Sequence, residues 1–104
     1  MRGFVPRVAE LHEEARLEIE EALAWYLRRS VRAAEGFLRE VERGLALVGE
    51  SPTLWSGFEQ DSRRTLLRKY PYARVYQLRD ERVIILAAPH LKRRPGYWRA
   101  RGAQ

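Results

Sequence analysis

Four side chains in the second half of the sequence are of types that could carry out chemistry on a phosphodiester. They are Arg64, Arg68, His90 and Tyr97. Cleavage of RNA without a metal needs a base for the 2′-hydroxyl, cations for the charge that develops on phosphorus, and an acid for the leaving oxygen. Arginine supplies the cations, histidine titrates near neutrality, and tyrosine can donate a proton or stack on a base. These four residues are therefore the candidate catalytic set if the target is RNA.

Each of these residues also has a structural interpretation. Four cations lie within seven residues, at Arg63, Arg64, Arg68 and Lys69. They would protect a sheet edge, although four cations exceed what such protection needs. His90 follows a strongly apolar segment, so packing or hydrogen bonding explains it more simply than catalysis. Tyr97 and Trp98 would cover an open sheet face.

Charge is divided unevenly along the chain. Residues 1–61 hold 8 arginines against 12 carboxylates, a balance of −4. Residues 62–104 hold 12 lysines and arginines against Asp80 and Glu81, a balance of +10. The net charge of +6 would favour solubility, but an even distribution would do so equally well. The asymmetry favours a face that binds a polyanion, either nucleic acid or an acidic protein segment.

Composition excludes several classes of protein. The 104 residues, 45% hydrophobic and 33% charged, indicate one globular domain over 1–104. With no cysteine and two histidines there is no dense metal-ligand set, and no glycine-rich nucleotide loop is present, so we expect no metal and no cofactor. The lack of cysteine fits a reducing cytoplasm, and no apolar run approaches the ~20 residues of a membrane span. We expect a cytoplasmic protein without membrane association.

Hydrophobic periodicity predicts the elements that must position these residues. Residues 4–11 resemble a short strand, and a helix follows from Glu13. A second helix starts at the candidate N-cap Ser30 and should stop near Gly49 and Pro52, which gives an antiparallel hairpin. The apolar stripes expected in the core are Ala15, Ile19, Ala22, Leu23, Tyr26 and Leu27, then Ala34, Phe37, Leu38, Val41, Leu45 and Val48. The carboxylates of Glu14, Glu18 and Glu21 are interpreted as a solvated helix face.

A polar loop over residues 53–62 leads into three strand-like segments. They cover 63–69, 72–79 and 82–88. Short junctions predict antiparallel hairpins, and Arg64 and Arg68 should share one face of the first strand. The last segment is apolar on both faces, so we expect it at the sheet centre, between the helices and either the C-terminal tail or a partner. The prediction is an α+β fold of order β-α-α-β-β-β, with an antiparallel sheet packed on a helical hairpin.

Four motifs in this order of elements resemble the RelE/ParE toxin superfamily, also called plasmid stabilisation proteins. In the helical part they are His12-Glu13-Glu14-Ala15 leading into Ala22-Leu23-Ala24-Trp25-Tyr26, and Ala34-x-x-Phe37-Leu38-x-x-Val41-Glu42 followed by Ser51-Pro52. In the strand part they are Arg63-Arg64-x-x-Leu67-Arg68-Lys69-Tyr70-Pro71-Tyr72 with Val75-Tyr76-x-Leu78, and His90-x-x-Arg93-Arg94-Pro95-x-Tyr97-Trp98-x-x-Arg101. Their ordered occurrence over about nine tenths of the chain makes the resemblance specific. Pro89 departs from the pattern, because a small or aliphatic residue is expected there.

The resemblance implies the toxin of a type II toxin–antitoxin system. ParE-like members inhibit DNA gyrase without known catalysis, and RelE-like members cut messenger RNA in the ribosome. The arginine-dominated cation cluster and the C-terminal motif are more similar to the ParE-like branch, which we favour over the endoribonuclease, with a plain nucleic-acid-binding module as a third class. The implied target-binding residues are Arg63, Arg68, Lys69, Arg93, Arg94 and Trp98.

The resemblance also implies a cognate antitoxin as partner. Its extended segment would cover the apolar sheet face or the helical groove and neutralise the basic half of the chain. The free toxin would then expose apolar surface and could form homo-oligomers. Whether the chain is an enzyme depends on which target it has.

Overall fold

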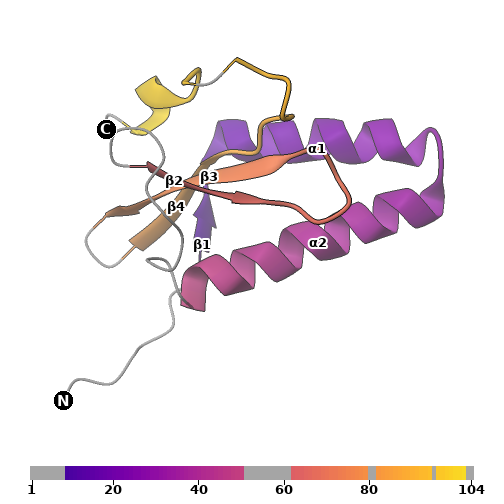
Figure 1. Ribbon diagram of the computed structural model, residues 1–104, viewed down its shortest axis with the longest axis horizontal. Helices are drawn as coiled ribbons and strands as arrows, with labels where there is room; N and C mark the ends of the chain where they lie inside the picture. Colours follow the sequence, from indigo (N-terminus) through magenta and orange to yellow (C-terminus); the bar gives the residue numbers. More distant parts are fainter. Residues whose placement is uncertain (1–8, 51–61, 80–81, 95, 103–104) are drawn as a thin grey trace.

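The structure is a computed structural model and describes residues 9–50, 62–79, 82–94 and 96–102. Its elements are β1 (Ala9–Leu11), α1 (Glu13–Leu27), α2 (Val31–Glu50), β2 (Ser62–Leu66), β3 (Ala73–Arg79), β4 (Arg82–Ala87) and the 3-10 turn η1 (Arg99–Gly102) (Figure 1). The predicted α+β class and the β-α-α-β-β-β order are confirmed. Residues 4–8 of the first predicted strand and the loop up to residue 61 lie outside the described residues.

Both helices start at the predicted positions because a side chain caps each first turn. His12 caps α1, and its Nδ1 accepts a hydrogen bond from the Glu14 N–H at 3.1 Å. Ser30 precedes α2, and its Oγ accepts one from the Ala33 N–H at 3.1 Å. Neither helix is apolar enough along its length to cross a bilayer, and no other α-helix occurs in the described part of the chain.

Three details of the predicted helices differ in the structure. The second helix continues through Glu50, so Gly49 lies inside it, while Pro52 is outside the described residues. Leu27 and Leu38, assigned to the two apolar stripes, are 51% and 39% exposed. Leu27 is the last residue of α1, at the end of the helical hairpin, which extends beyond the sheet (Figure 1).

The sheet has the strand order β1-β4-β3-β2, so β4 is central as predicted. β2 with β3, and β3 with β4, pair antiparallel, but β1 pairs parallel with β4. The sheet is therefore mixed, and the wholly antiparallel arrangement that we predicted is wrong for β1. A tight hairpin forces antiparallel pairing, whereas β1 and β4 are separated by most of the chain and no such turn joins them.

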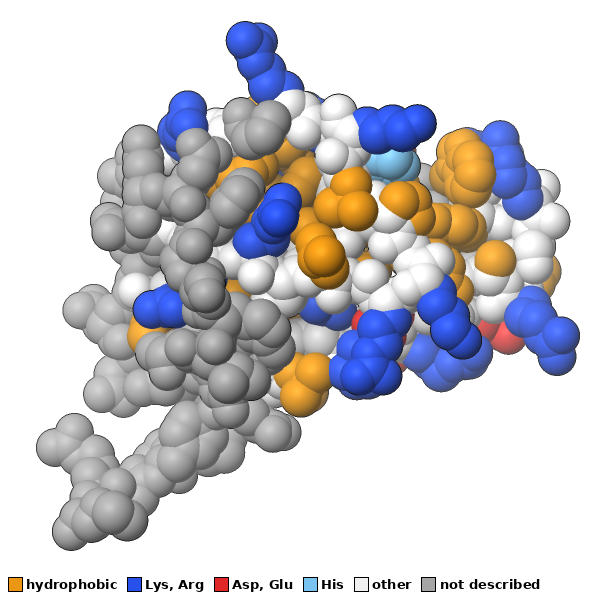
Figure 2. Space-filling model, viewed as in Figure 1, with side chains coloured by type: hydrophobic (Ala, Val, Ile, Leu, Met, Phe, Trp, Pro, Cys, Tyr) orange, Lys and Arg blue, Asp and Glu red, His pale blue; other side chains and the backbone are white. Residues whose placement is uncertain are grey.

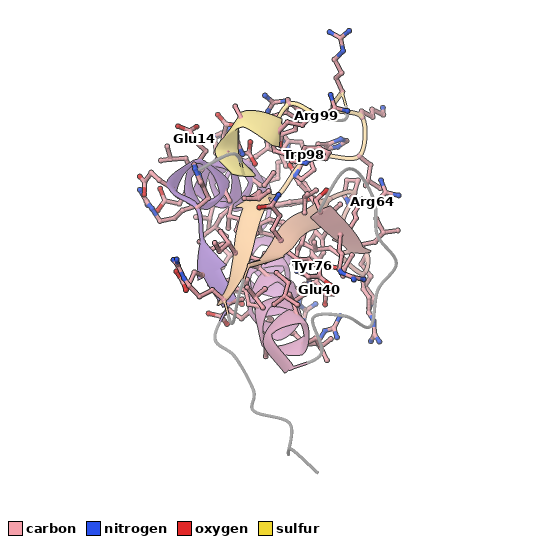
Figure 3. The ribbon with its side chains drawn as sticks, turned by 90° about the vertical axis from the view of Figure 1, so that its left-hand side faces the viewer. Glu14, Glu40, Arg64, Tyr76, Trp98 and Arg99 are labelled. Carbon is pink, nitrogen blue, oxygen red and sulfur yellow. The ribbon has the colours of Figure 1, made fainter. Side chains whose placement is uncertain are left out.

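Both faces of β4 are covered. On the helical side, Val83 and Ile85 pack with Ala15 of α1 and Val48 of α2. On the other side, Leu86 and Ala87 pack with Val75 and Trp98. Figures 1 and 3 both show the sheet between α2 and η1. We predicted that either the C-terminal tail or a partner covers this second face, and the structure shows Trp98 of the tail packed on it.

Candidate functional site

A cleft of about 540 Å³ lies between α1 and the segment that follows β4. We call it the aromatic cleft, after the rings of Trp25, Tyr26, Tyr72, His90 and Tyr97 that line it. The Tyr72 and His90 rings meet edge to face at 5.1 Å, and Trp25 is 44% exposed. The cleft therefore offers ring surface to a partner, with Trp25 as its most accessible part.

Glu18 fixes the C-terminal segment beside this cleft. Its Oε1 accepts a hydrogen bond from the Ala88 N–H at 2.9 Å, and its Oε2 accepts one from Arg101 at 3.0 Å. Arg93 lies 4.0 Å from the same Oε2. The Glu18 side chain is 15% exposed, so its assignment to a solvated stripe is wrong. The signal in the sequence is its spacing, three residues after Ala15 and one before Ile19, on the buried face of α1.

Two cations lie near the ring of Tyr97. The Arg93 guanidinium is 3.8 Å from its ring centroid, and that of Arg101 is 5.1 Å away. Its hydroxyl is buried and has no hydrogen-bond partner among the described residues. Burial, together with the negative charge of Glu18, raises the pKa of Tyr97 well above its usual value. A phenol that is hard to ionise is a poor proton donor, so this environment favours packing over proton transfer.

His90 is held by a local hydrogen bond. Its Nδ1 accepts from the Lys92 N–H at 3.1 Å. A neutral imidazole that accepts at Nδ1 carries its proton on Nε2. As oriented, the ring can therefore donate a hydrogen bond through Nε2, but neither nitrogen is ready to accept a proton, which disfavours the role of general base.

A second, smaller pocket of about 40 Å³ adjoins His90. Arg64 of β2 lines it together with His90 and Arg93 from the segment after β4, and Trp98 also contributes. Figure 3 shows Arg64 and Trp98 toward the end of the molecule that carries the C-terminal segment. Of the four candidate catalytic residues, the structure brings Arg64 and His90 to one pocket, and Tyr97 lies next to Arg93 in the adjoining cleft.

Trp98 is 3% exposed and packs against Val75, Leu86 and Ala87. This position agrees with the interpretation that it covers the sheet, and its burial argues against direct contact with a target. Arg93 and Arg94, in contrast, are exposed on the same segment.

Arg68 and Lys69 lie in the turn after β2, which ends at Leu66, and not on the strand. The prediction that Arg64 and Arg68 share a strand face is therefore wrong. Lys69 has a φ of 68°, a left-handed conformation that no strand accommodates. The Arg68 N–H donates to Glu40 of α2 at 3.0 Å instead of pairing with a strand.

These two cations join three arginines of α2 around an open depression of about 740 Å³. We call it the basic depression, and its cations are Arg32, Arg39, Arg43, Arg68 and Lys69. Figure 2 shows Lys and Arg side chains gathered over α2 along the lower edge of that face. The α2 arginines were not identified from the sequence because residues 1–61 are acidic overall. Their spacing of seven and four residues, which places them on one helix face, was the available signal.

Two glycines of α2 allow the turn and β3 to approach the helix closely. A Cβ at Gly36 would lie 2.3 Å from the Tyr70 Oη, and a Cβ at Gly44 would lie 1.7 Å from the Arg74 Cζ. The Tyr70 hydroxyl donates to the Ala33 carbonyl at 3.0 Å. The glycine at position 36 thus lets Tyr70 pack directly on the backbone of α2 at the basic depression.

Glu40 lies between these glycines, four residues from each. A hydrogen bond from Arg43 at 2.6 Å, with help from the Arg68 N–H and the charge of Arg74, lowers the pKa of Glu40 to about 2. Arg74 is buried and donates to the Thr65 Oγ1 at 2.7 Å and to the Glu40 carbonyl at 2.9 Å. Burial lowers the pKa of Arg74 to about 10, a value at which it is still charged near neutral pH.

The six predicted target-binding residues therefore occupy different surfaces. Arg68 and Lys69 line the basic depression, Arg93 lines the aromatic cleft, and Trp98 is in the core. Arg63 is half-buried on β2. In the described ranges, no three histidine or carboxylate side chains come close enough to hold a metal ion.

No protein-family model matches the chain, and neither does any curated protein sequence. Among solved structures, the chain is similar to one described as a chromosomal ParDE TA system from P. aeruginosa, with a TM-score of 0.71 and 11% sequence identity. The match covers 81% of this chain and 95% of that chain. At such low identity the likeness concerns the fold, and the chain has the RelE/ParE-like fold that its motifs predicted.

Proposed function

We propose that the chain is the toxin of a type II toxin–antitoxin module and that it inhibits DNA gyrase. The observation that carries this proposal is the fold likeness to a chain of a ParDE TA system over 81% of the sequence. The ordered motifs, above all the C-terminal His-x-x-Arg-Arg-Pro-x-Tyr-Trp pattern, support the same assignment. A protein antitoxin is then the expected partner.

The arrangement of the candidate catalytic residues supports a toxin that acts by binding. Arg68 faces the basic depression, away from the pocket that Arg64 and His90 line. His90 uses Nδ1 for a backbone hydrogen bond. Because the set is divided between surfaces, a concerted reaction on one phosphodiester would require a rearrangement.

One observation favours the alternative, a ribosome-dependent mRNA endoribonuclease. Arg64, His90 and Arg93 line the same pocket. Two guanidinium groups could stabilise charge on phosphorus, and the Nε2–H of His90 could donate a hydrogen bond to the leaving oxygen. An acid for that oxygen would still have to come from the ribosome, and a base for the 2′-hydroxyl from the ribosome or from a change of tautomer.

The aromatic cleft is the surface that we assign to the antitoxin. The sheet face opposite the helices, which was the other candidate surface for the antitoxin, is already covered by Trp98. The cleft combines the exposed ring of Trp25 with Arg93, whose side chain is 53% exposed. An acidic peptide segment with apolar side chains could pack those side chains on Trp25 and pair a carboxylate with Arg93.

The test is induced expression in bacteria that lack the antitoxin, with pulse labelling of nascent DNA and protein. We expect a prompt fall in DNA synthesis with intact messages, and inhibition of supercoiling by purified gyrase. The double variant Arg64→Ala/His90→Ala should inhibit gyrase as the parent chain does. A prompt fall in protein synthesis with cleaved messages, abolished in that variant, would replace gyrase inhibition by the nuclease. Normal growth with unchanged labelling would reject both.

A further inference from the structure

We propose that the basic depression binds the phosphodiester backbone of nucleic acid. Five cations surround it and only one carboxylate, Glu40, lies among its residues. It is separate from the aromatic cleft and from the Arg64–His90 pocket. The proposal goes beyond gyrase inhibition, because it concerns a direct contact with nucleic acid that the assigned target does not require.

The spacing of the α2 arginines matches a regular polyanion. Arg32, Arg39 and Arg43 lie along one face of the helix, which rises about 16 Å between the first and the last. One strand of duplex DNA presents a phosphate about every 3.4 Å of axis, so this length faces about five phosphates. Arg68 and Lys69 add two cations beside the row, from the turn after β2.

Glu40 does not cancel this positive surface. Its carboxylate accepts hydrogen bonds from the Arg43 side chain and from the Arg68 N–H, and the buried Arg74 lies 3.9 Å from it. The carboxylate is therefore compensated within the protein. The side chains of Arg32, Arg39 and Lys69 are exposed and form no ion pair with Glu40.

The composition of the depression favours nucleic acid over an acidic protein segment. None of the large hydrophobic residues exposed in the described part of the chain lines it, and the hydroxyl of its single aromatic residue, Tyr70, is bound to the Ala33 carbonyl. Tight binding of a peptide needs buried apolar anchors. Binding of a phosphate backbone needs cations alone, because the release of counterions drives it.

The experiment measures binding of the full chain to a short labelled DNA duplex by fluorescence anisotropy over a range of salt concentrations. A single-stranded RNA of the same length and polyglutamate serve as the other probes. The test variant carries Arg32→Gln, Arg39→Gln and Lys69→Gln. The matched control removes the same charge from exposed cations elsewhere, Arg82→Gln, Lys92→Gln and Arg99→Gln. A third variant, Arg32→Lys/Arg39→Lys, keeps the charge of the depression.

We expect the first triple variant to bind about tenfold more weakly or worse, and to lower the slope of log affinity against log salt by about three. The control triple should lose less than about threefold, and the lysine variant should bind nearly as the parent does. Tighter binding of either the DNA duplex or the RNA would show which nucleic acid the depression binds. Equal losses in both triples, no salt-dependent binding, or equally tight binding of polyglutamate at this surface would each overturn the proposal. Gyrase inhibition, assayed on the same variants, tests the proposed function separately.

Discussion

The aromatic cleft and the basic depression share no lining residue and are built in opposite ways. At the cleft, the charged groups are part of the structure: Glu18 and Arg101 are both about 15% exposed and bonded to each other and to backbone groups of β4 and its end. At the depression, buried charge stays beneath the surface in Glu40 and Arg74, and the outer cations Arg32 and Arg39 are exposed.

This difference separates residues that hold the fold from residues that are free to bind. Truncating a charge that is bonded and poorly solvated leaves its partner uncompensated, which costs stability. Truncating an exposed cation removes little from the folded state, because water solvates it in both states. Substitutions of Glu18 and Arg101 beside the cleft should therefore affect folding first, and substitutions of the outer cations of the depression should affect binding first.

The largest expected effect is at Glu18. Replacement by alanine leaves the Ala88 N–H and the Arg101 guanidinium without their acceptor and should lower the free energy of unfolding by about 3 kcal/mol. Urea denaturation followed by circular dichroism measures this loss. The matched control is Glu14→Ala on the exposed side of the same helix, which should cost less than about 0.5 kcal/mol. Equal midpoints for the two variants would contradict the assignment of Glu18 as the anchor of the C-terminal segment.

The next effect is at Gly44, beneath the basic depression. A methyl group there would displace the guanidinium of Arg74 from the Thr65 hydroxyl and the Glu40 carbonyl, and we expect a loss of about 2 kcal/mol despite the better helix propensity of alanine. Thermal denaturation of Gly44→Ala in the parent and in an Arg74→Met background measures the coupling. If the cost is the same in both backgrounds, displacement of Arg74 is not its cause.

The sequence was sufficient for the parts of the fold that depend on local pattern. The start of α1 at Glu13 follows from hydrophobic periodicity, that of α2 after Ser30 from capping chemistry, and the central position of β4 from an apolar run on both faces. The parallel pairing of β1 and the end of β2 at Leu66 depend on tertiary contacts that periodicity does not encode.

The candidate site was predicted less completely, for the same reason. The cations were identified as a group, but which of them share a surface depends on the turn at Lys69 and on the approach of Arg74 to Gly44. Both are contacts between segments far apart in the sequence. The net charge of the segment also hid the α2 arginines, because the 12 carboxylates of residues 1–61 outnumber its 8 arginines.

A smaller effect is expected at Glu40, and it depends on pH. Its pKa in the folded protein is about 2, below the usual 4.5, so the unfolded chain takes up the proton first as the pH falls. The contribution of Glu40 is therefore present above about pH 4.5 and is lost between about pH 4.5 and pH 2. Glu40→Gln should cost about 1 kcal/mol at neutral pH and should lose stability less steeply over that acid range. Parallel acid titrations of parent and variant, monitored by melting temperature, would contradict this expectation if their slopes were the same.

The smallest effect is expected at Tyr97, and it tests the division between folding and chemistry at the cleft itself. Its ring lies close to the guanidinium groups of Arg93 and Arg101, and its hydroxyl is buried without a hydrogen-bond partner among the described residues. Tyr97→Phe keeps the ring and removes only the hydroxyl, so the free energy of unfolding should change by less than about 0.5 kcal/mol. Growth arrest should persist, because a toxin that acts by binding needs no proton from this phenol. Loss of arrest at unchanged stability would instead identify the hydroxyl as a functional group, and would favour the endoribonuclease over the gyrase inhibitor.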